Sequence, residues 1–246
     1  AEEDEVSGAF SGQKGKLITG IIQQDASDPS NVHVAMGDVE AILPRREQVP
    51  GERYRHGERI RVYVVNVARG IKGPEIVVSR SHPELVRKLF EREVPELVSG
   101  AVSIMAIARE AGARTKMAVW SKDPNVNPVS ACIGEHGARV AAVVEKLGGE
   151  KIDIVKWSED ISEFISAALS PAKVVKVELL PGETRSCRVT VPDQQLSLAI
   201  GNKGQNARLC ARLTGYNIDI RPESGYYGEE EPKAAEAEKT EDTAAE

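Results

Sequence analysis

The chain has 246 residues, of which 41% are hydrophobic and 4% aromatic, and its formal net charge is −6. This length predicts about two domains, and the few aromatic residues argue against cores or binding faces built from Trp, Tyr and Phe. The three cysteines form neither a Cys-x-x-Cys pair nor a Cys/His ligand spacing, and no apolar run approaches the ~18 residues of a membrane span. We therefore expect a cytoplasmic protein with no disulfide scaffold, no membrane segment, no metal and no other cofactor.

Charge is distributed unevenly along the chain. Residues 223–246 contain nine acidic residues against two lysines, and residues 2–5 add four more acids. We therefore expect an acidic connector at 1–9 and a disordered acidic tail at 223–246, whose only large apolar residues are two tyrosines. The stretch between them, 10–222, holds 30 basic against 25 acidic residues, which suits either a polyanion partner or an ordinary solvated surface.

The segment that follows the connector, residues 10–81, contains short apolar runs separated by turn signals such as Gly37-Asp38 and Pro50-Gly51. The predicted strands are 16–23, 32–34, 40–43, 59–67 and 75–79. Five short strands without a helical period favour a small closed barrel over an open sheet with exposed edges.

The pattern changes after Pro83, where four apolar residues at helical spacing predict a helix over 84–93. Beyond it, the order strand, strand, helix, strand occurs twice. The first set is predicted at 101–109, 115–120, 139–147 and 151–157, followed by a helix at 160–169, and the second set at 173–180, 185–191, 206–213 and 217–221.

Two sequence matches identify this recurrence as an internal repeat. Ile-Gly-Glu-His-Gly at 133–137 matches Ile-Gly-Asn-Lys-Gly at 200–204, and Ile-Asp-Ile at 152–154 matches the same triplet at 218–220. We interpret the two halves as tandem copies of one α+β unit.

The bare Gly-x-x-Gly pattern occurs five times in the chain and by itself carries little information. The pairs at 134/137 and 201/204 differ from the others because each follows an apolar helix-like step, opens a second helix and precedes an Ile-Asp-Ile strand. Glycines in such a turn have no Cβ to keep a nucleic-acid backbone away, and the N–H groups of the following helix favour phosphate. A KH domain clamps about four nucleotides of single-stranded RNA in this way. A purely structural helical hairpin is the alternative.

The candidate RNA-binding residues are the two turns, polar positions at the start of the following helices, and the repeated strands. In the first unit they are Gly134, Glu135, His136, Gly137, Arg139, Ile152, Asp153 and Ile154, and in the second unit Gly201, Asn202, Lys203, Gly204, Gln205, Asn206, Arg208, Arg212, Ile218 and Asp219.

Several stretches of the chain together point to one family. They are GKLITG at 15–20, LPR at 43–45, VSRSHP at 78–83, AREAG at 108–112, GGEKIDI at 148–154, SPAKV at 170–174 and, most closely, VPDQQLSLAIGNKGQNARL at 191–209. With these stretches, over roughly 10–222, the chain resembles the NusA family of bacterial transcription elongation and termination factors. The order of the domains, barrel before KH before KH, is also that of the family, whereas polynucleotide phosphorylase places KH before the barrel.

The resemblance implies an α+β, multidomain fold with an S1-type OB β-barrel at 10–81, a first type II KH domain at 82–172 and a second at 173–222. It also implies a monomeric arm that binds nascent single-stranded RNA across both KH domains and modulates polymerase pausing, termination and antitermination, with no catalytic residue. The family's polymerase-binding N-terminal domain is absent from the chain, so RNA polymerase is expected to be contacted by the full-length parent. A general RNA-binding module in translation or RNA decay is the alternative function.

The first turn departs from the family because Glu135 places a carboxylate beside the expected path of the phosphates. The second unit has eight basic against four acidic residues in 173–222, and we expect it to be the electrostatic anchor of the RNA. In the barrel only His33 and Tyr63 are candidates to stack on bases, and each is more typical of an ordinary surface or core residue.

The sequence argues against an enzyme. Cys132 and His136 lie four residues apart, but no third orienting residue accompanies them, and a buried core cysteine is the simpler interpretation. Asp153 and Asp219 occupy equivalent strands of separate units, which suits acceptors for bases on the strand surface and argues against a general acid and base.

Overall fold

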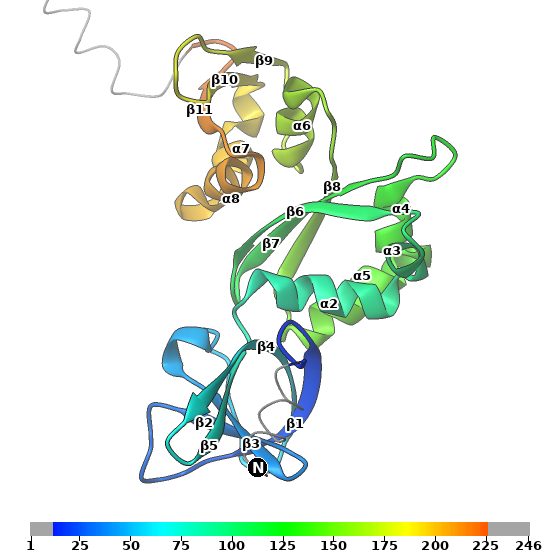
Figure 1. The fold of residues 1–246 in the computed structure, drawn as a ribbon. Helices are drawn as coiled ribbons and strands as arrows, with labels where there is room; N and C mark the ends of the chain where they lie inside the picture. Colours follow the sequence, from blue (N-terminus) through cyan, green and yellow to red (C-terminus); the bar gives the residue numbers. More distant parts are fainter. Residues whose placement is uncertain (1–11, 226–246) are drawn as a thin grey trace, which may run out of the picture. The chain divides into compact units, whose positions relative to one another are not determined.

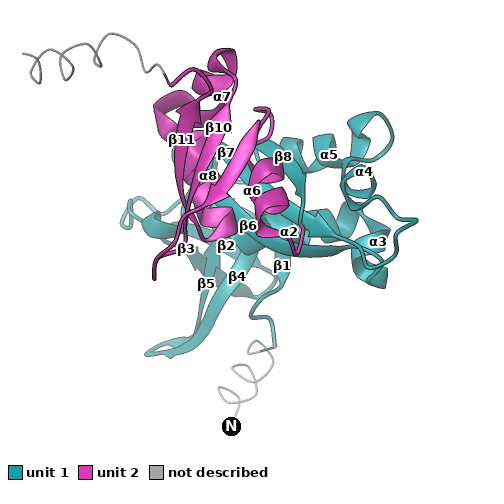
Figure 2. Ribbon diagram, turned by 90° about the horizontal axis from the view of Figure 1, so that it is seen from above, with its two compact units in different colours: residues 1–157 teal, residues 158–246 magenta. Residues whose placement is uncertain are grey.

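A computed structural model describes residues 12–225 of the chain and divides it into two compact units, 1–157 and 158–246 (Figure 2). The expected acidic connector at 1–9 and all but the first three residues of the expected acidic tail lie outside the described residues.

The first unit begins with a closed five-stranded barrel, as the sequence predicts (Figure 1). Its strands are β1 (Leu17–Gln23), β2 (Val32–Met36), β3 (Val39–Leu43), β4 (Arg59–Gly70) and β5 (Gly73–Ser79), in the closed order β1-β2-β3-β5-β4. Only the β3–β5 pair is parallel. Alternate valines and isoleucines fill the interior, and Gly20 lets β1 approach β2 closely, because a Cβ there would lie 2.4 Å from the Val34 side chain.

The barrel leads into a domain in the same unit with the order α-β-β-α-α-β and one additional short helix after the first. Its elements are α2 (Pro83–Glu93), α3 (Pro95–Ser99), β6 (Ser103–Glu110), β7 (Arg114–Trp120), α4 (Pro128–Ile133), α5 (Ala138–Lys146) and β8 (Lys151–Lys156). In the sheet, β7 pairs antiparallel with β6 and parallel with β8. Helix α2 begins where predicted, because Pro83 occupies its first turn and His82 Nδ1 accepts a hydrogen bond from the Glu84 N–H. The short α3 was not predicted.

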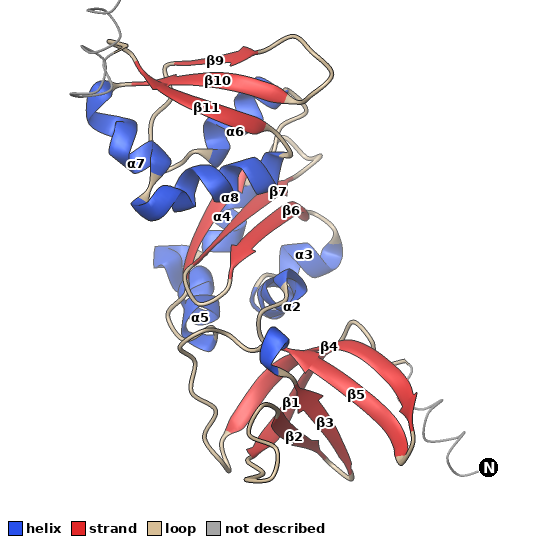
Figure 3. Cartoon of the chain, turned by 90° about the vertical axis from the view of Figure 1, so that its left-hand side faces the viewer, coloured by secondary structure: helices blue, strands red, loops and turns tan. Residues whose placement is uncertain are grey.

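The second unit repeats this order. Its elements are α6 (Ile161–Ala168), β9 (Lys176–Leu179), β10 (Ser186–Val191), α7 (Leu196–Ile200), α8 (Gln205–Thr214) and β11 (Asn217–Pro222). Strand β10 pairs antiparallel with β9 and parallel with β11, as β7 does with β6 and β8. The helices cover one face of the three-stranded sheet (Figure 3).

The domain boundary differs from the sequence-based one. The sequence analysis placed residues 158–172, with their helix, in the first KH domain, but α6 belongs to the second compact unit. There it packs against α8 and β9, and the Asn206 side chain donates a hydrogen bond to the Leu169 carbonyl at 3.2 Å. The reason is that α6 opens the second unit as α2 opens the first. The Ser170-Pro171 signal ends this helix and not the domain.

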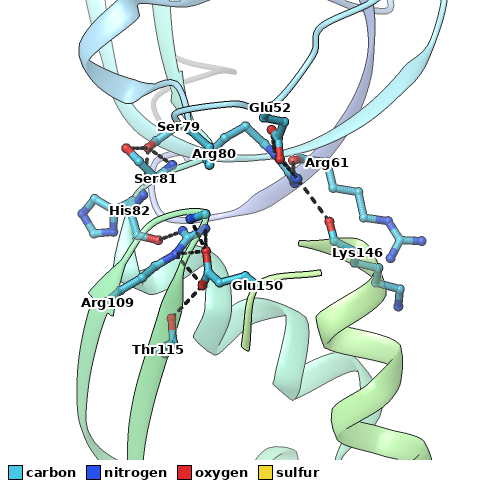
Figure 4. A network of polar contacts seen from close by, with 12 residues as sticks. Glu52, Arg61, Ser79, Arg80, Ser81, His82, Arg109, Thr115, Lys146 and Glu150 are labelled. Carbon is cyan, nitrogen blue, oxygen red and sulfur yellow. Dashed lines mark hydrogen bonds and ion pairs between the residues drawn. The ribbon is translucent and has the colours of Figure 1, made fainter. Parts of the chain in front are cut away.

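The barrel and the first α+β domain are joined by a polar network around Arg80 (Figure 4). Arg80 forms a bidentate ion pair with Glu52 at 2.8 and 2.9 Å and donates to the Arg61 carbonyl at 2.9 Å, all within the barrel. Its Nη2 also donates to the Lys146 carbonyl at 3.1 Å, at the end of α5. One buried guanidinium therefore connects the barrel to the last turn of α5.

A second buried pair lies beside it. Arg109 and Glu150 are each 1% exposed, and the Arg109 guanidinium contacts the Glu150 carboxylate through Nε and Nη2, both at 3.0 Å. The same carboxylate accepts hydrogen bonds from the Gly112 N–H and the Thr115 hydroxyl, both at 2.7 Å. Arg109 also donates to the His82 carbonyl at 2.9 Å, at the start of α2. This pair ties the β6–β7 turn, β8 and α2 together.

Removing the charge of Glu150 should destabilise the first unit strongly. In Glu150→Gln the Arg109 guanidinium stays buried without its counter-charge, and we expect a loss of about 3–5 kcal/mol in the free energy of unfolding. Urea unfolding followed by tryptophan fluorescence reports on this unit, because both tryptophans of the chain, Trp120 and Trp157, lie within it.

The matched control is Glu84→Gln, which breaks the half-exposed Glu84–Arg87 pair on α2. This change should cost less than about 1 kcal/mol. Equal effects of the two substitutions would contradict a structural role for the buried pair.

Candidate nucleic-acid interface

The two Gly-x-x-Gly turns have the same backbone conformation. Their opening glycines, Gly134 and Gly201, have φ values of 79° and 80°. The third residues, His136 and Lys203, both have a φ of 53°, and the closing glycines are also left-handed. The repeat found in the sequence is therefore a repeat of turn geometry, despite the different residues at its centre.

The two glycines of each turn have different roles. A Cβ on Gly201 would lie 2.7 Å from the Asn206 backbone nitrogen, and one on Gly134 would lie 2.6 Å from Arg139 Cγ. The opening glycine thus lets the turn pack against the following helix. The closing glycines face open space, since a Cβ on Gly137 would meet no atom within 4 Å and one on Gly204 would meet only Arg208 Nη1, at 3.8 Å. An RNA backbone can approach at this second position.

Each turn presents the start of a helix that no side chain caps. Helices α5 and α8 have a glycine at the N-cap and no side-chain hydrogen bond there. The first N–H groups of a helix have no partner within the helix, and together with the helix dipole they favour an anion. The first N–H of each helix, that of Ala138 or Gln205, already donates to the Glu135 or Asn202 carbonyl of the turn. The helix dipole and the N–H groups of the next residues are therefore what each turn can direct at a phosphate.

Arg139 and Asn206, which the sequence analysis placed among the RNA contacts, act as supports of the turns. Arg139 Nη1 donates to the Ala131 carbonyl at 2.7 Å and to Glu96 of α3 at 2.8 Å. The equivalent Asn206 is buried, and its amide donates to the Ala199 carbonyl at 2.9 Å. Each side chain thus links the helix after the turn to the helix before it.

The exposed side chains of the two turns differ in charge. Glu135 and His136 are both more than 90% exposed, with 3.8 Å between the imidazole and the carboxylate. In the second turn Asn202 and Lys203 are exposed. Arg208 Nη1 donates to the Lys203 carbonyl at 3.0 Å, which keeps a second cation beside this turn. The structure therefore places cationic groups at the second turn and a carboxylate at the first.

Further along α8, Arg212 is exposed, and Gln205 lies at the first position of the helix. These two residues and Arg208 follow one side of the helix from the turn, at the i, i+3 and i+7 positions.

The Ile-Asp-Ile triplets lie on the edge strands β8 and β11. Ile152 and Ile154 pack against the core, so Asp153 between them points to the opposite face of the sheet. There its carboxylate lies 3.2 Å from Lys116 Nζ. In the second unit Ile218 is partly buried, and Asp219 lies 2.9 Å from Arg221 Nε and 3.5 Å from Arg188 Nε. Both aspartates are thus engaged by cations of their own sheet.

The aromatic candidates of the barrel are also engaged within the fold. The two ring nitrogens of His33 contact Glu40 at 2.6 Å and Asp28 at 3.0 Å. The Tyr63 ring stacks on His82 with 4.7 Å between the ring centroids. The edge of the His33 ring and one face of the Tyr63 ring are therefore already in use within the fold.

The cysteines are buried side chains without the environment of a nucleophile. Burial raises the pKa of the Cys132 and Cys187 thiols to about 11, so both are protonated at neutral pH. Within residues 12–225, no three His, Cys, Asp or Glu side chains are grouped so that they could hold a metal ion. No helix of the described part is long and apolar enough to span a membrane.

Comparison with known protein families assigns a domain type to both α+β domains. Residues 80–157 match the model of the NusA-like first KH domain, and residues 161–227 match that of the NusA-like second KH domain. These limits agree with the boundary between the two compact units and with α6 as the opening helix of the second domain.

Curated relatives extend the match over most of the chain. It is 50% identical to the transcription termination/antitermination protein NusA of Halalkalibacterium halodurans, over 91% of this chain and 58% of that protein. With the proteins of the same name from Mycobacterium tuberculosis and Thermus thermophilus, identity is 52% and 48%, over 90% and 89% of this chain. The chain spans 65% and 56% of those two relatives. The chain therefore belongs to the NusA family, and it contains both KH domains of that family.

Proposed function

We propose that this chain is the single-stranded RNA-binding arm of a NusA-like transcription factor, and that it modulates RNA polymerase pausing, termination and antitermination by holding nascent RNA. The observation that carries the proposal is the duplicated turn, with one backbone conformation, an open closing glycine and an uncapped helix start in both copies. Contact with RNA polymerase is assigned to the full-length protein, and one chain, as a monomer, binds one RNA strand.

The two turns contribute to RNA binding in different ways. Each holds the RNA backbone through the N–H groups at the start of α5 or α8, and the edge strands β8 and β11 offer backbone groups to the bases. The second KH domain adds the charges of Lys203, Arg208 and Arg212. The first domain binds by shape and backbone N–H groups, because Glu135 repels phosphate and Arg139 is held by Glu96.

The two exposed positions of the second turn allow a test that leaves its glycines in place. Asn202→Asp combined with Lys203→Asp should lower the affinity for a short single-stranded RNA about tenfold or more, because carboxylates replace neutral and cationic groups beside the phosphates. The fold should survive, since Asp accepts the left-handed conformation of Lys203 better than most residues do. Fluorescence anisotropy measures the affinity and circular dichroism the fold.

A control with the same change in charge is Lys173→Asp combined with Gln194→Asp. Both residues are exposed, and Gln194 lies beyond the end of α7 that is remote from the turn. This double variant should retain RNA affinity within a small factor. Equal losses in both variants would mean that overall charge, and not the turn, governs binding.

The salt dependence of binding should identify the second domain as the anchor. Each neutralised phosphate of a single strand contributes about −0.7 to the slope of log affinity against log salt, so Lys203→Ala, Arg208→Ala and Arg212→Ala together should flatten the slope by up to ~2 units. Arg139→Ala should change the slope by less than about one unit while lowering the stability of the first unit. A larger change of slope for Arg139→Ala than for the triple variant would refute this assignment.

The role in transcription is tested in the full-length protein. Carrying Asn202→Asp and Lys203→Asp, it should still bind RNA polymerase but lose most of its effect on pausing and termination in a purified transcription assay. Undiminished effects despite lost RNA binding would contradict the proposal. If the full-length protein did not associate with polymerase at all, the general RNA-binding role in translation or decay would be favoured.

A further inference from the structure

The outer strand of the second KH domain has an open edge. Strand β9 lies at the end of the order β11-β10-β9 (Figure 3). The Leu180 N–H donates to the Ser186 carbonyl of β10 at 2.9 Å. Because bonded and non-bonded pairs alternate in an antiparallel ladder, the backbone groups of Lys176 and Glu178 also face β10. The N–H and C=O groups of Val177 and Leu179 consequently point to the free edge.

Aliphatic side chains accompany this open edge. Val175, Leu179 and Leu180 are 52%, 48% and 36% exposed. Val177 lines a groove between β9 and α6, whose other wall includes the small residues Ser166 and Ala167. Natural proteins usually protect an edge strand with charge, proline or a covering element. Strand β9 carries charge, in Lys176 and Glu178, but the two charges are of opposite sign and a partner strand can match them. An open edge flanked by exposed aliphatic groups is suited to accepting another strand.

The charges of β9 indicate which strand fits. Lys176 and Glu178 lie on the same face of the strand, with 2.7 Å between Nζ and Oε1. If two copies of β9 pair antiparallel about a two-fold axis at Val177, Lys176 of each copy lies opposite Glu178 of the other. The same register places Val175 opposite Leu179, where the ladder between the copies is incomplete because the Val175 N–H already donates to the Thr190 carbonyl of β10 at 2.8 Å. Pairing about Glu178 would set two carboxylates against each other, and like charges directly opposite are destabilising. The strand is therefore complementary to itself in one register.

We propose that β9 is a self-association surface, through which two copies of this chain join their second KH sheets into one continuous six-stranded sheet. The interface is isologous, as a two-fold axis requires. The acidic C-terminal stretch of the same chain is a poor occupant, because residues 223–246 contain no Val, Leu or Ile and nine acidic residues. The RNA-binding monomer is then in a concentration-dependent equilibrium with this dimer.

Charge exchange tests this pairing in the 246-residue chain. Sedimentation velocity from micromolar to millimolar concentration should show a reversible dimer for the wild-type chain. Lys176→Glu gives each strand two acids and Glu178→Lys gives each two lysines, so each variant alone should dimerise about tenfold or more weakly. An equimolar mixture of the two variants restores opposite charges across the axis and should regain the wild-type dimer.

Each other outcome overturns the proposal. A wild-type chain that stays monomeric throughout has no such interface, and dimers unaffected by either variant use another surface. A mixture that fails to recover the dimer contradicts the register, provided that circular dichroism shows both variants folded. The RNA affinity of both variants, measured at nanomolar protein, should match the wild type, so failure of this proposal is distinguishable from failure of the RNA-binding one.

Discussion

The first unit depends on two buried guanidinium groups, each of whose three nitrogens donates a hydrogen bond within the chain. Arg109 is paired with Glu150 and bonded to the His82 carbonyl, while Arg80 is paired with Glu52 and bonded to the Lys146 carbonyl. Burial of a charge is unfavourable unless such partners are supplied. The partners come from the barrel, α2, α5 and β8, so these elements must keep one arrangement. Helix α5, which begins at the first Gly-x-x-Gly turn, is thereby held to the barrel at its other end.

Among the described residues of the second unit, 158–225, there is no copy of this arrangement. The residue at the position equivalent to Glu150 is Tyr216. The second unit begins at residue 158, just before its opening helix α6. The two KH domains therefore share a fold and a turn, but they are supported differently. The turn geometry is common to both because it arises from local causes: a left-handed third residue, a close approach at the opening glycine and a brace from the next helix.

Because the two KH domains are supported differently, we expect them to bind RNA differently. The first turn has a repulsive Glu135 and a brace, Arg139, that is bonded to Glu96, so the RNA contacts that we propose for it are made by backbone groups. The second turn uses a neutral, buried brace, Asn206, so none of its cations is needed in that role. In the second domain the two sheet edges also differ. β11 lies at one edge, which we assign to RNA, and β9 lies at the other, which we assign to a second copy.

Much of the fold followed from local patterns in the sequence. Valine-rich runs between Gly and Pro turns predicted the barrel strands to within a few residues, and the repeated Ile-Gly-x-x-Gly and Ile-Asp-Ile segments located both KH turns and their edge strands. The two turns lie where the glycine spacing placed them, since glycine spacing and helix starts are local properties, and their contact with RNA stays a prediction. The short α3 was missed because five residues are too few to show a helical period.

Contacts between distant residues were decided only by the tertiary structure. Residue type alone made Arg139 look like a phosphate ligand, but Glu96, 43 positions away, makes it a support of the turn. The aspartates of the strands meet cations on neighbouring strands, and His33 meets two carboxylates. The sequence alone determined the fold class, the family resemblance and the position of both turns. Only the tertiary structure decided which of the charged side chains are already paired, because pairing depends on distances that the order of residues does not contain.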